Sequence, residues 1–300
     1  MYLLGHGFFV SGTLVSSTNL LHISMTHAEQ LAQFIQKYPK LVVLTGAGIS
    51  TDAGIPAYRD KEGNWMHSAP VQHKEYMSSY YARQRFWARS LIGWPLIRDA
   101  EPSDAHYALT ELEQLGYIKL LITQNVDRLH QRSGSQNVID LHGRSDRVKC
   151  MSCDHNFDRR PLHELSAEMN PQFEIRKATA RPDGDAALET EAFKDFRVPD
   201  CEHCGGILKP DVVYFGDNVP KESVFNALEQ LKQADALLTV GTSLMVYSGY
   251  RFCKRAHEWN KPVCALNLGV TRADPILDLK LDAPIKETLE EAVQLLKENS

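Results

Sequence analysis

The sequence LVVLTGAGIS, residues 41–50, begins as a short apolar run and passes directly into a glycine-rich turn. Such a run is typical of a strand buried on both faces of a parallel sheet. Similar runs lie at 120–123, 237–240 and 263–266, and a helical pattern at 221–233 separates two of them. This alternation predicts an α/β fold on a doubly wound, Rossmann-like parallel sheet.

Polar or glycine-rich segments follow all four runs. Ligands of doubly wound sheets bind beyond the carboxyl ends of the strands, so we expect one nucleotide site formed by 46–48, 124–127, 241–243 and 267–269. The glycines would let the backbone approach a pyrophosphate, with amide N–H groups as donors. A dehydrogenase fingerprint would need glycine where Thr51 stands. This disfavours hydride transfer and leaves an ordinary βα turn as the alternative.

Two stretches interrupt the alternation. Residues 61–104 are interpreted as a helical insertion whose aromatics belong to a core, and residues 145–209 as a metal-binding module; together they would form a small domain. The ranges 26–60, 105–144 and 210–300 are assigned to the Rossmann-like domain. A capping box at Thr26 and Glu29 predicts the first helix, and residues 1–25, which contain no Lys, Arg, Asp or Glu, are expected to be a disordered extension or an over-long start.

Four of the six cysteines form two C-x-x-C pairs. The thiolates of Cys150, Cys153, Cys201 and Cys204 would complete a closed tetrahedral structural zinc site. The 47 residues between the pairs exceed the usual zinc-ribbon spacing of about 15–20. Disulfides and a redox C-x-x-C are the alternatives. Cys253 and Cys264 are interpreted as small buried hydrophobic residues.

Composition restricts the partners. A net charge of -5 opposes binding to nucleic acid and favours the basic tail of a substrate protein. No apolar run approaches the roughly 18 residues of a membrane span, and the N-terminus lacks the pattern of a secretory signal. We therefore expect a cytoplasmic protein, or a mitochondrial one in a eukaryote. Oligomeric state stays open, with a monomer as the default.

Several motifs together resemble the sirtuin family. GAGIS at 46–50 continues with GIP at 54–56 and Tyr58-Arg59, and the other motifs follow in family order: TQNVD at 123–127, LHG at 141–143, KPDVVYFG at 209–216, GTSL at 241–244 and NLG at 267–269. The resemblance covers roughly residues 31–285. PVQH at 70–73, RQRFWAR at 83–89 and RPDGD at 181–185 most resemble the class II branch, which includes mitochondrial members and bacterial relatives.

The resemblance implies an NAD-dependent protein lysine deacylase that transfers the acyl group to ADP-ribose, releases nicotinamide and holds one structural zinc. The cofactor-binding residues that it implies are Gly46, Ala47, Gly48, Ile49, Ser50, Asp52, Ile55, Pro56, Tyr58, Arg59, Gln124, Asn125, Val126, Asp127, Gly241, Thr242, Ser243, Asn267, Leu268, Gly269 and Ile285. An acyl-lysine peptide would lie as an added strand near Val213, Phe215, Gly216 and Val246. Tyr58 stands where family members often have phenylalanine.

His142 is the predicted general base, since an imidazole can take a proton from a ribose hydroxyl near neutral pH. By the same resemblance, Asp127 bonds the nicotinamide carboxamide and Asn125 orients ribose or water. Gln124 would contact a ribose hydroxyl, and Arg59 would lie near the diphosphate. His130 is the rival base. Protein ADP-ribosylation and lipoamidase activity use the same residues and remain alternatives, as do a dehydrogenase and a non-catalytic NAD-binding module.

Overall fold

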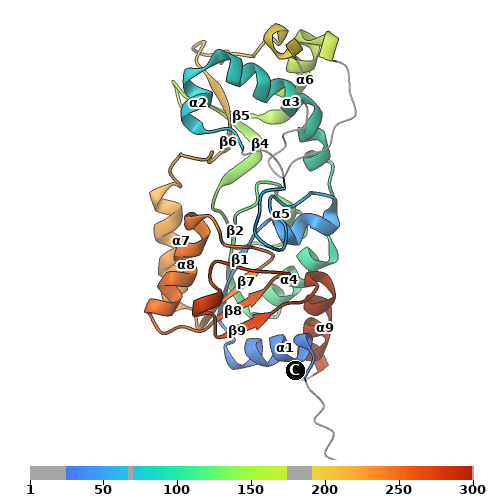
Figure 1. Ribbon diagram of the computed structural model, residues 1–300, viewed down its shortest axis with the longest axis vertical. Coiled ribbons are helices and arrows are strands. Elements are labelled where there is room, and N and C mark those ends of the chain that lie inside the picture. The colour runs from blue at the N-terminus through green and yellow to red at the C-terminus, as the bar shows by residue number, and fades with distance from the viewer. Residues whose placement is uncertain (1–24, 67–69, 174–190, 299–300) are drawn as a thin grey trace, which may run out of the picture.

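The computed structural model describes residues 25–66, 70–173 and 191–298. It is elongated, with an α/β layer structure at one end and a smaller unit of helices and antiparallel strands at the other (Figure 1). The predicted extension, apart from Met25, and the RPDGD segment lie outside the described residues. Within the described ranges, no helix is both long and apolar enough to cross a membrane.

The predicted parallel sheet is confirmed. Within the described residues it has six strands in the order β3-β2-β1-β7-β8-β9, all pairing in parallel. Four match the predicted runs: β1 (Leu41–Thr45), β2 (Ile118–Thr123), β7 (Ala236–Val240) and β8 (Val263–Leu266). The edge strands β3 (Val138–Asp140) and β9 (Leu279–Leu281) were not predicted, because three residues are too short to show a pattern.

The strand order places a topological switch beside β1. The chain moves outward on one side to β2 and β3, then returns to the other side of β1 for β7, β8 and β9. Thr45 at the end of β1 pairs with Thr123 on one side and Val240 on the other. The segments after these three strands therefore leave the sheet at one height, which is where doubly wound folds bind ligands.

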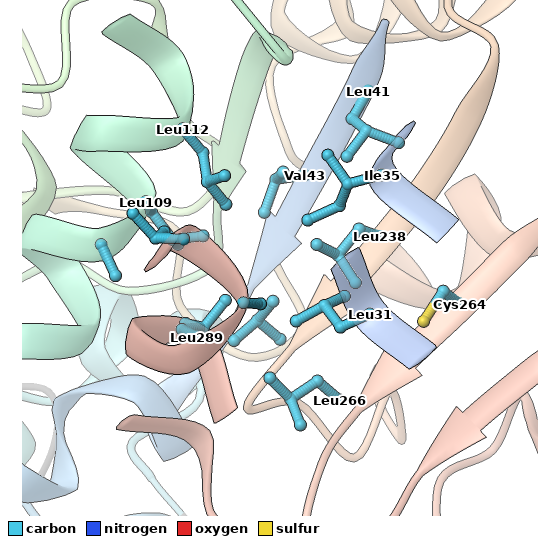
Figure 2. Packing of buried hydrophobic residues seen from close by; sticks show 14 of the residues in the cluster. Leu31, Ile35, Leu41, Val43, Leu109, Leu112, Leu238, Cys264, Leu266 and Leu289 are labelled. Carbon is cyan, nitrogen blue, oxygen red and sulfur yellow. The ribbon is translucent and has the colours of Figure 1, made fainter. Parts of the chain in front are cut away.

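Helices cover both faces of the sheet. The helices on one face are α1 (His27–Lys37), α4 (Asp104–Gln114) and α9 (Ile285–Glu298), and α7 (Lys221–Gln233) and α8 (Tyr247–Glu258) pack on the other (Figure 1). Figure 2 shows Leu31 of α1, Leu109 of α4 and Leu289 of α9 meeting the sheet. Truncating one such leucine to alanine is expected to cost about 2–5 kcal/mol.

Two local predictions are confirmed in this part. Glu29 N–H donates to Thr26 Oγ1 at 3.1 Å and Thr26 N–H donates to the Glu29 carboxylate at 2.7 Å, which completes the capping box of α1. Cys253 and Cys264 are fully buried in the apolar layers on opposite faces of the sheet. Both therefore act as small core residues.

The smaller unit joins the predicted insertion to the cysteine module. A sheet of β4 (Gly143–Cys150), β5 (Asn156–Asp158) and β6 (Leu208–Val212) packs with α2 (His73–Ser78), α3 (Tyr80–Arg98) and α6 (Arg159–Met169). The core interpretation is correct for Tyr76, Phe86, Trp87 and Trp94 and wrong for Tyr80 and Tyr81, which are exposed. The exact domain boundaries stay a prediction.

Short elements complete the chain. They are η1 (Ala47–Ala53), α5 (Leu129–Arg132), η2 (Pro171–Phe173), η3 (Glu191–Asp195) and η4 (Asp274–Ile276). Phe193 in η3 and Phe196 just after it are buried against Phe86 and Trp87, so the chain after the undescribed segment returns to the core of the smaller unit.

Candidate active site

A cavity of about 660 Å³ lies beyond the carboxyl ends of β1, β2 and β7. Most of the predicted site residues line it: Gly46, Ala47, Gly48, Asp52, Tyr58, Arg59, Gln124, Asn125, Val126, His142, Val213, Phe215, Gly216, Gly241, Thr242, Ser243, Val246, Asn267, Leu268 and Ile285. The other predicted residues lie outside this lining: Ile49, Ser50, Ile55, Pro56, Asp127 and Gly269. The four strand-end segments do converge on one site.

The glycines of the first turn fit against the turn after β7. A Cβ atom on Gly46 would lie 2.7 Å from Thr242 Cβ, and one on Gly48 would lie 2.8 Å from the Gly241 carbonyl oxygen. The amide N–H of Gly46 donates to Val240 O at 3.2 Å and that of Gly48 donates to Gly241 O at 2.8 Å. Neither of these two amides is therefore free to donate to a pyrophosphate, and for the rest of the turn N–H donation to a pyrophosphate stays a prediction. Their glycines bring two backbone turns together and leave room beside them for a ligand.

His142 is held at both ring nitrogens. Nδ1 lies 3.0 Å from the backbone carbonyl of Gln124, and Nε2 lies 2.7 Å from Ser248 Oγ. Because a carbonyl only accepts, Nδ1 carries the proton and the Nε2 lone pair accepts the Ser248 O–H. Burial lowers the pKa of His142 to about 4, opposed by the Gln124 hydrogen bond and aided by nearby Arg251. At neutral pH the ring is an uncharged base at the cavity wall, with its Nε2 lone pair on the Ser248 hydroxyl.

The side chain of Gln124 fixes the neighbouring turn. Its Nε2 donates to Thr242 Oγ1 at 2.9 Å and to Thr45 O at 3.2 Å. The side chain thereby links the ends of β1, β2 and β7, while its backbone carbonyl orients His142. Sequence reasoning gave Gln124 a ribose contact only, and these supporting contacts come from residues 79 and 118 positions away.

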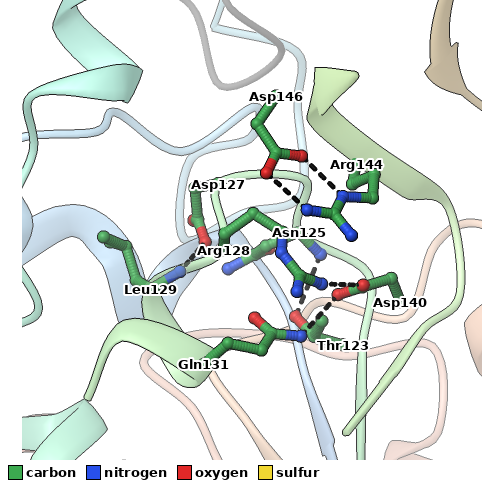
Figure 3. A network of polar contacts seen from close by, with 9 residues as sticks. All are labelled: Thr123, Asn125, Asp127, Arg128, Leu129, Gln131, Asp140, Arg144 and Asp146. Atoms are coloured by element: carbon green, nitrogen blue, oxygen red, sulfur yellow. Dashed lines mark hydrogen bonds and ion pairs between the residues drawn. The ribbon is translucent and has the colours of Figure 1, made fainter. Parts of the chain in front are cut away.

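Asn125 and Asp127 share a buried network with Ser50. Asn125 Nδ2 donates to Ser50 Oγ and to Gly46 O, both at 3.1 Å, and Ser50 Oγ donates to Asp127 Oδ2 at 2.8 Å. Leu129 N–H donates to the other Asp127 oxygen at 2.9 Å (Figure 3). Burial raises the pKa of Asp127, and the hydrogen bonds from Leu129 and Ser50, which lower it, do not outweigh the effect of burial. Asp127 thus lies one layer behind Asn125, which does line the cavity.

His130, the rival base, lies away from the cavity lining. It is 1% exposed, its Nε2 lies 2.9 Å from Thr45 Oγ1, and its ring packs 4.8 Å from that of His106. Burial lowers the pKa of His130 well below its ordinary value, with His106 contributing. Its position suits a buried structural residue and leaves His142 as the imidazole at the cavity wall.

A set of ion pairs supports the turn after β2. Arg128, in the left-handed conformation with φ of 69°, pairs with Asp140, which also accepts from Gln131 at 2.9 Å. Arg144 of β4 bonds Asp146 through two nitrogens, at 2.6 and 2.5 Å (Figure 3). The Arg128 and Gln131 contacts connect the start of α5 with β3, whereas the Arg144 pair lies within β4. Sequence reasoning did not predict the Arg128–Asp140 pair, because its partners are 12 residues apart and leave no local pattern.

Aromatic rings connect the cofactor-side loop to the 213–216 segment. Trp65 packs edge-on against Tyr58 at 6.1 Å and Phe215 at 5.7 Å between ring centroids. The guanidinium of Arg59 lies 4.0 Å from the Trp65 ring, and its Nη1 donates to Gly63 O at 2.7 Å. Trp65 lines the cavity and was missed as a site residue, since its position in the sequence indicated the helical insertion.

The 213–216 segment is fixed from both sides. Val213 N–H donates to the backbone carbonyl of His142 at 2.8 Å. His73 N–H donates to Phe215 O at 2.9 Å, and the His73 ring lies 3.1 Å from the Asp217 carboxylate. The backbone carrying the base and the predicted peptide-binding segment are therefore directly joined.

The four predicted metal ligands come together. The Sγ atoms of Cys150, Cys153, Cys201 and Cys204 lie within 4.8 Å of one another. Two of the separations are 3.5 and 3.8 Å, close to the roughly 3.8 Å expected between thiolates around tetrahedral zinc with bonds of about 2.3 Å. None of the six cysteines forms a disulfide, which excludes that alternative within this structure. The donor set and spacing fit one closed structural zinc site.

The local backbone is shaped for this site. Cys150 N–H donates to His155 O at 2.8 Å and Cys201 N–H donates to Gly206 O at 2.9 Å, so each pair lies on a tight turn. A Cβ atom on Gly206 would lie 3.0 Å from Cys150 Sγ. Burial raises the pKa of the Cys150 thiol, but N–H groups aimed at the sulfur outweigh it and lower the value to about 6. The thiolate, which is the form that binds zinc, is therefore favoured.

A parallel sheet with a glycine-rich crevice at its switch point, a neutral histidine on the crevice wall and a four-thiolate module defines a dinucleotide-using α/β enzyme. The model of the Sir2 family matches residues 46–248, and the chain belongs to this family. The resemblance to sirtuins is thereby confirmed.

Relatives and solved structures agree. The chain is 51% identical to "NAD-dependent protein deacetylase 2" of Bradyrhizobium diazoefficiens over 85% of this chain and 93% of that protein. It is 42% identical to "NAD-dependent protein deacylase Sirt4" of Drosophila melanogaster, over 85% of this chain and 83% of that protein. A Sir2 enzyme structure has a TM-score of 0.72 and 31% identity, covering 91% of this chain and 99% of that one. A Sir2–p53 peptide–NAD+ complex has a TM-score of 0.70 and 27% identity, covering 90% and 98%.

Proposed function

We propose that this protein is an NAD-dependent protein lysine deacylase that transfers the acyl group to ADP-ribose. The observation that carries the proposal is a neutral imidazole, His142, in the wall of a cavity at the switch point of the sheet. Family membership and relatives named as NAD-dependent deacetylases support it. The Drosophila relative named as a deacylase supports a broader range of acyl groups than acetyl alone.

NAD would lie across the ends of β1, β2 and β7. Gly46, Gly48 and Gly241 let two turns pack closely at this end of the sheet, and the diphosphate would lie beside these turns, with Arg59 as a nearby cation. Asn125 would orient the nicotinamide-side ribose or water, with Asp127 fixing Asn125 through Ser50. NAD supplies a ribose carbon that can release nicotinamide and accept the acyl oxygen.

His142 moves the proton of the reaction. Its Nε2 takes a proton from a ribose hydroxyl next to the reacting carbon. The ring becomes an imidazolium whose Nδ1–H still donates to the Gln124 carbonyl, so the charge forms against an oriented acceptor. The low pKa of about 4 keeps the base unprotonated before the step at neutral pH.

The acyl-lysine peptide would lie as an extra strand between the 213–216 segment and the turn before α8. Val213, Phe215, Gly216 and Val246 line the cavity there, with Phe215 and Val246 beside the lysine side chain. Because main-chain pairing ignores most side chains, we expect modest sequence selectivity. A Sir2 structure with a p53 peptide supports peptide substrates of this kind.

The zinc ion would be structural. Four thiolates leave no open coordination position, so the ion stabilises the smaller unit and takes no part in the chemistry. We also propose that the protein acts as a monomer, without nucleic acid, in the cytoplasm; the bacterial relatives support this compartment, and a eukaryotic source would favour mitochondria.

The test is incubation with NAD and peptides carrying acetyl, lipoyl or branched acyl lysine, following nicotinamide release and the mass of the ribose product. We expect free lysine and acyl-ADP-ribose in equal amounts. The His142→Ala variant should lose turnover and still bind NAD, and unchanged deacylation would contradict the role of His142. Labelled ADP-ribose on protein without an acylated product would favour the transferase alternative.

A further inference from the structure

Ser248 makes a direct contact with the proposed base, His142. It lies in the first turn of α8, is 9% exposed and lines the cavity. Its Oγ is 2.7 Å from His142 Nε2, the atom that must receive the proton. Since a single lone pair cannot accept from Ser248 and from a ribose hydroxyl at once, the serine hydroxyl must turn when the ligand arrives.

The backbone beside Ser248 is built to hold this geometry. A Cβ atom on Gly249 would lie only 2.5 Å from Gln124 Oε1, and the Gln124 side chain is itself held by two hydrogen bonds. The same Gln124 orients His142 through its carbonyl. Ser248 and Gly249 therefore pack closely against Gln124 and His142. This packing fixes the distance between Ser248 Oγ and His142 Nε2.

We propose that Ser248 binds the second hydroxyl of the vicinal diol on the nicotinamide-side ribose while His142 Nε2 binds the first. The two protein atoms are spaced like the two oxygens of a cis-diol, and a serine hydroxyl can both accept and donate. In the free protein the Ser248 O–H uses the Nε2 lone pair that the incoming hydroxyl needs. When NAD binds, one hydrogen bond inside the protein is exchanged for two to the ligand. This inference rests on the proposed function.

The test is a double-mutant cycle measured by calorimetric binding. Wild type and Ser248→Ala are titrated with NAD and with NAD analogues lacking the 2′- or the 3′-hydroxyl on the nicotinamide-side ribose. We expect Ser248→Ala to bind NAD about fivefold more weakly, the effect of one neutral hydrogen bond. Wild type should lose a similar factor with the analogue lacking the hydroxyl that Ser248 binds, and the variant should lose nothing further with that analogue.

Two variants serve as controls. Ser248→Thr keeps the hydroxyl and should bind NAD within about twofold of wild type. Ser166→Ala removes a similarly buried hydroxyl on α6, outside the cavity lining, and should leave NAD binding unchanged.

The outcomes separate the two ideas. The role of Ser248 would be overturned if Ser248→Ala lost as much affinity as wild type on removal of either ribose hydroxyl. It would also be overturned if the threonine variant bound NAD as weakly as the alanine variant. A wild-type protein that binds NAD but releases no nicotinamide with any acyl-lysine peptide would overturn the proposed function, and the binding cycle would still report on Ser248.

Discussion

Replacing His142 by asparagine tests whether burial keeps the base neutral. Asparagine can keep the Nδ1 contact by donating from Nδ2 to the Gln124 carbonyl, but its amide is too short to reach the Ser248 hydroxyl in place of Nε2. The substitution therefore removes the titrating nitrogen and its contact with Ser248. We expect turnover to fall about 10²–10⁴-fold, the usual contribution of a general base. NAD binding should stay close to that of wild type.

The same substitution should change how stability depends on pH. The pKa of His142 is about 4 in the folded protein, against an ordinary value of 6.5. Above pH 6.5 the ring is neutral in both folded and unfolded chains and contributes no pH dependence. Between pH 6.5 and 4 only the unfolded chain gains the proton, so the wild type loses stability as the pH falls. From pH 7 to 5 the loss at this site is about 1–2 kcal/mol, after a discount for the ring edge that faces the cavity.

The measurement is urea unfolding of both proteins at pH 7 and pH 5. Other buried histidines and the thiolates titrate equally in the two proteins, so the difference isolates His142. We expect the free energy of unfolding of the asparagine variant to fall by about 1–2 kcal/mol less than that of wild type. Equal falls would refute the reasoning, because they would mean that His142 takes up its proton normally in the folded state.

Cys201→Ser should lose zinc and thermal stability together, whereas Cys253→Ala, a change at a core thiol, should keep full zinc occupancy; metal analysis showing zinc retained in the serine variant would contradict the four-thiolate site. Gly48→Ala would place a methyl group 2.8 Å from a carbonyl oxygen and should weaken NAD binding at least tenfold, so wild-type affinity would show that this approach is not needed. Trp65→Ala removes the ring under Arg59 and should raise the KM for NAD about threefold to tenfold, with Trp65→Phe in between; an unchanged KM would refute that contribution.

The core strands could be predicted because both faces of the sheet are covered. Burial on both sides makes β1, β7 and β8 almost continuously apolar, a pattern that four or five residues suffice to show. The edge strand β3 is only partly buried and carries Asp140, so its sequence shows no such run. A strand could therefore be predicted from the sequence when it was long enough and buried on both faces.

The site was predictable where chemistry stays local to a strand end. Gly46, Asn125 and His142 each belong to a recognisable motif, and the structure brings all three to one cavity. Ser248 and Trp65 were missed because their roles depend on contacts across the fold; Ser248 reaches His142 from 106 positions away. The engagement of the Gly46 and Gly48 amides was missed for the same reason, since their acceptors, Val240 at the end of β7 and Gly241 just after it, lie far along the chain.

The zinc site and the base are parts of one backbone arrangement, although no metal chemistry connects them. His142 is followed directly by β4, which ends at Cys150 and pairs with β6 just after the second cysteine pair. At the start of β4, Gly143 has φ of 80°, and a Cβ there would lie 2.0 Å from the Asp211 carbonyl oxygen. A zinc ion that held β4 and β6 together would therefore also help to hold the His142 carbonyl against the Val213 N–H, which couples the position of the base and of the predicted peptide-binding segment to the folding of the module.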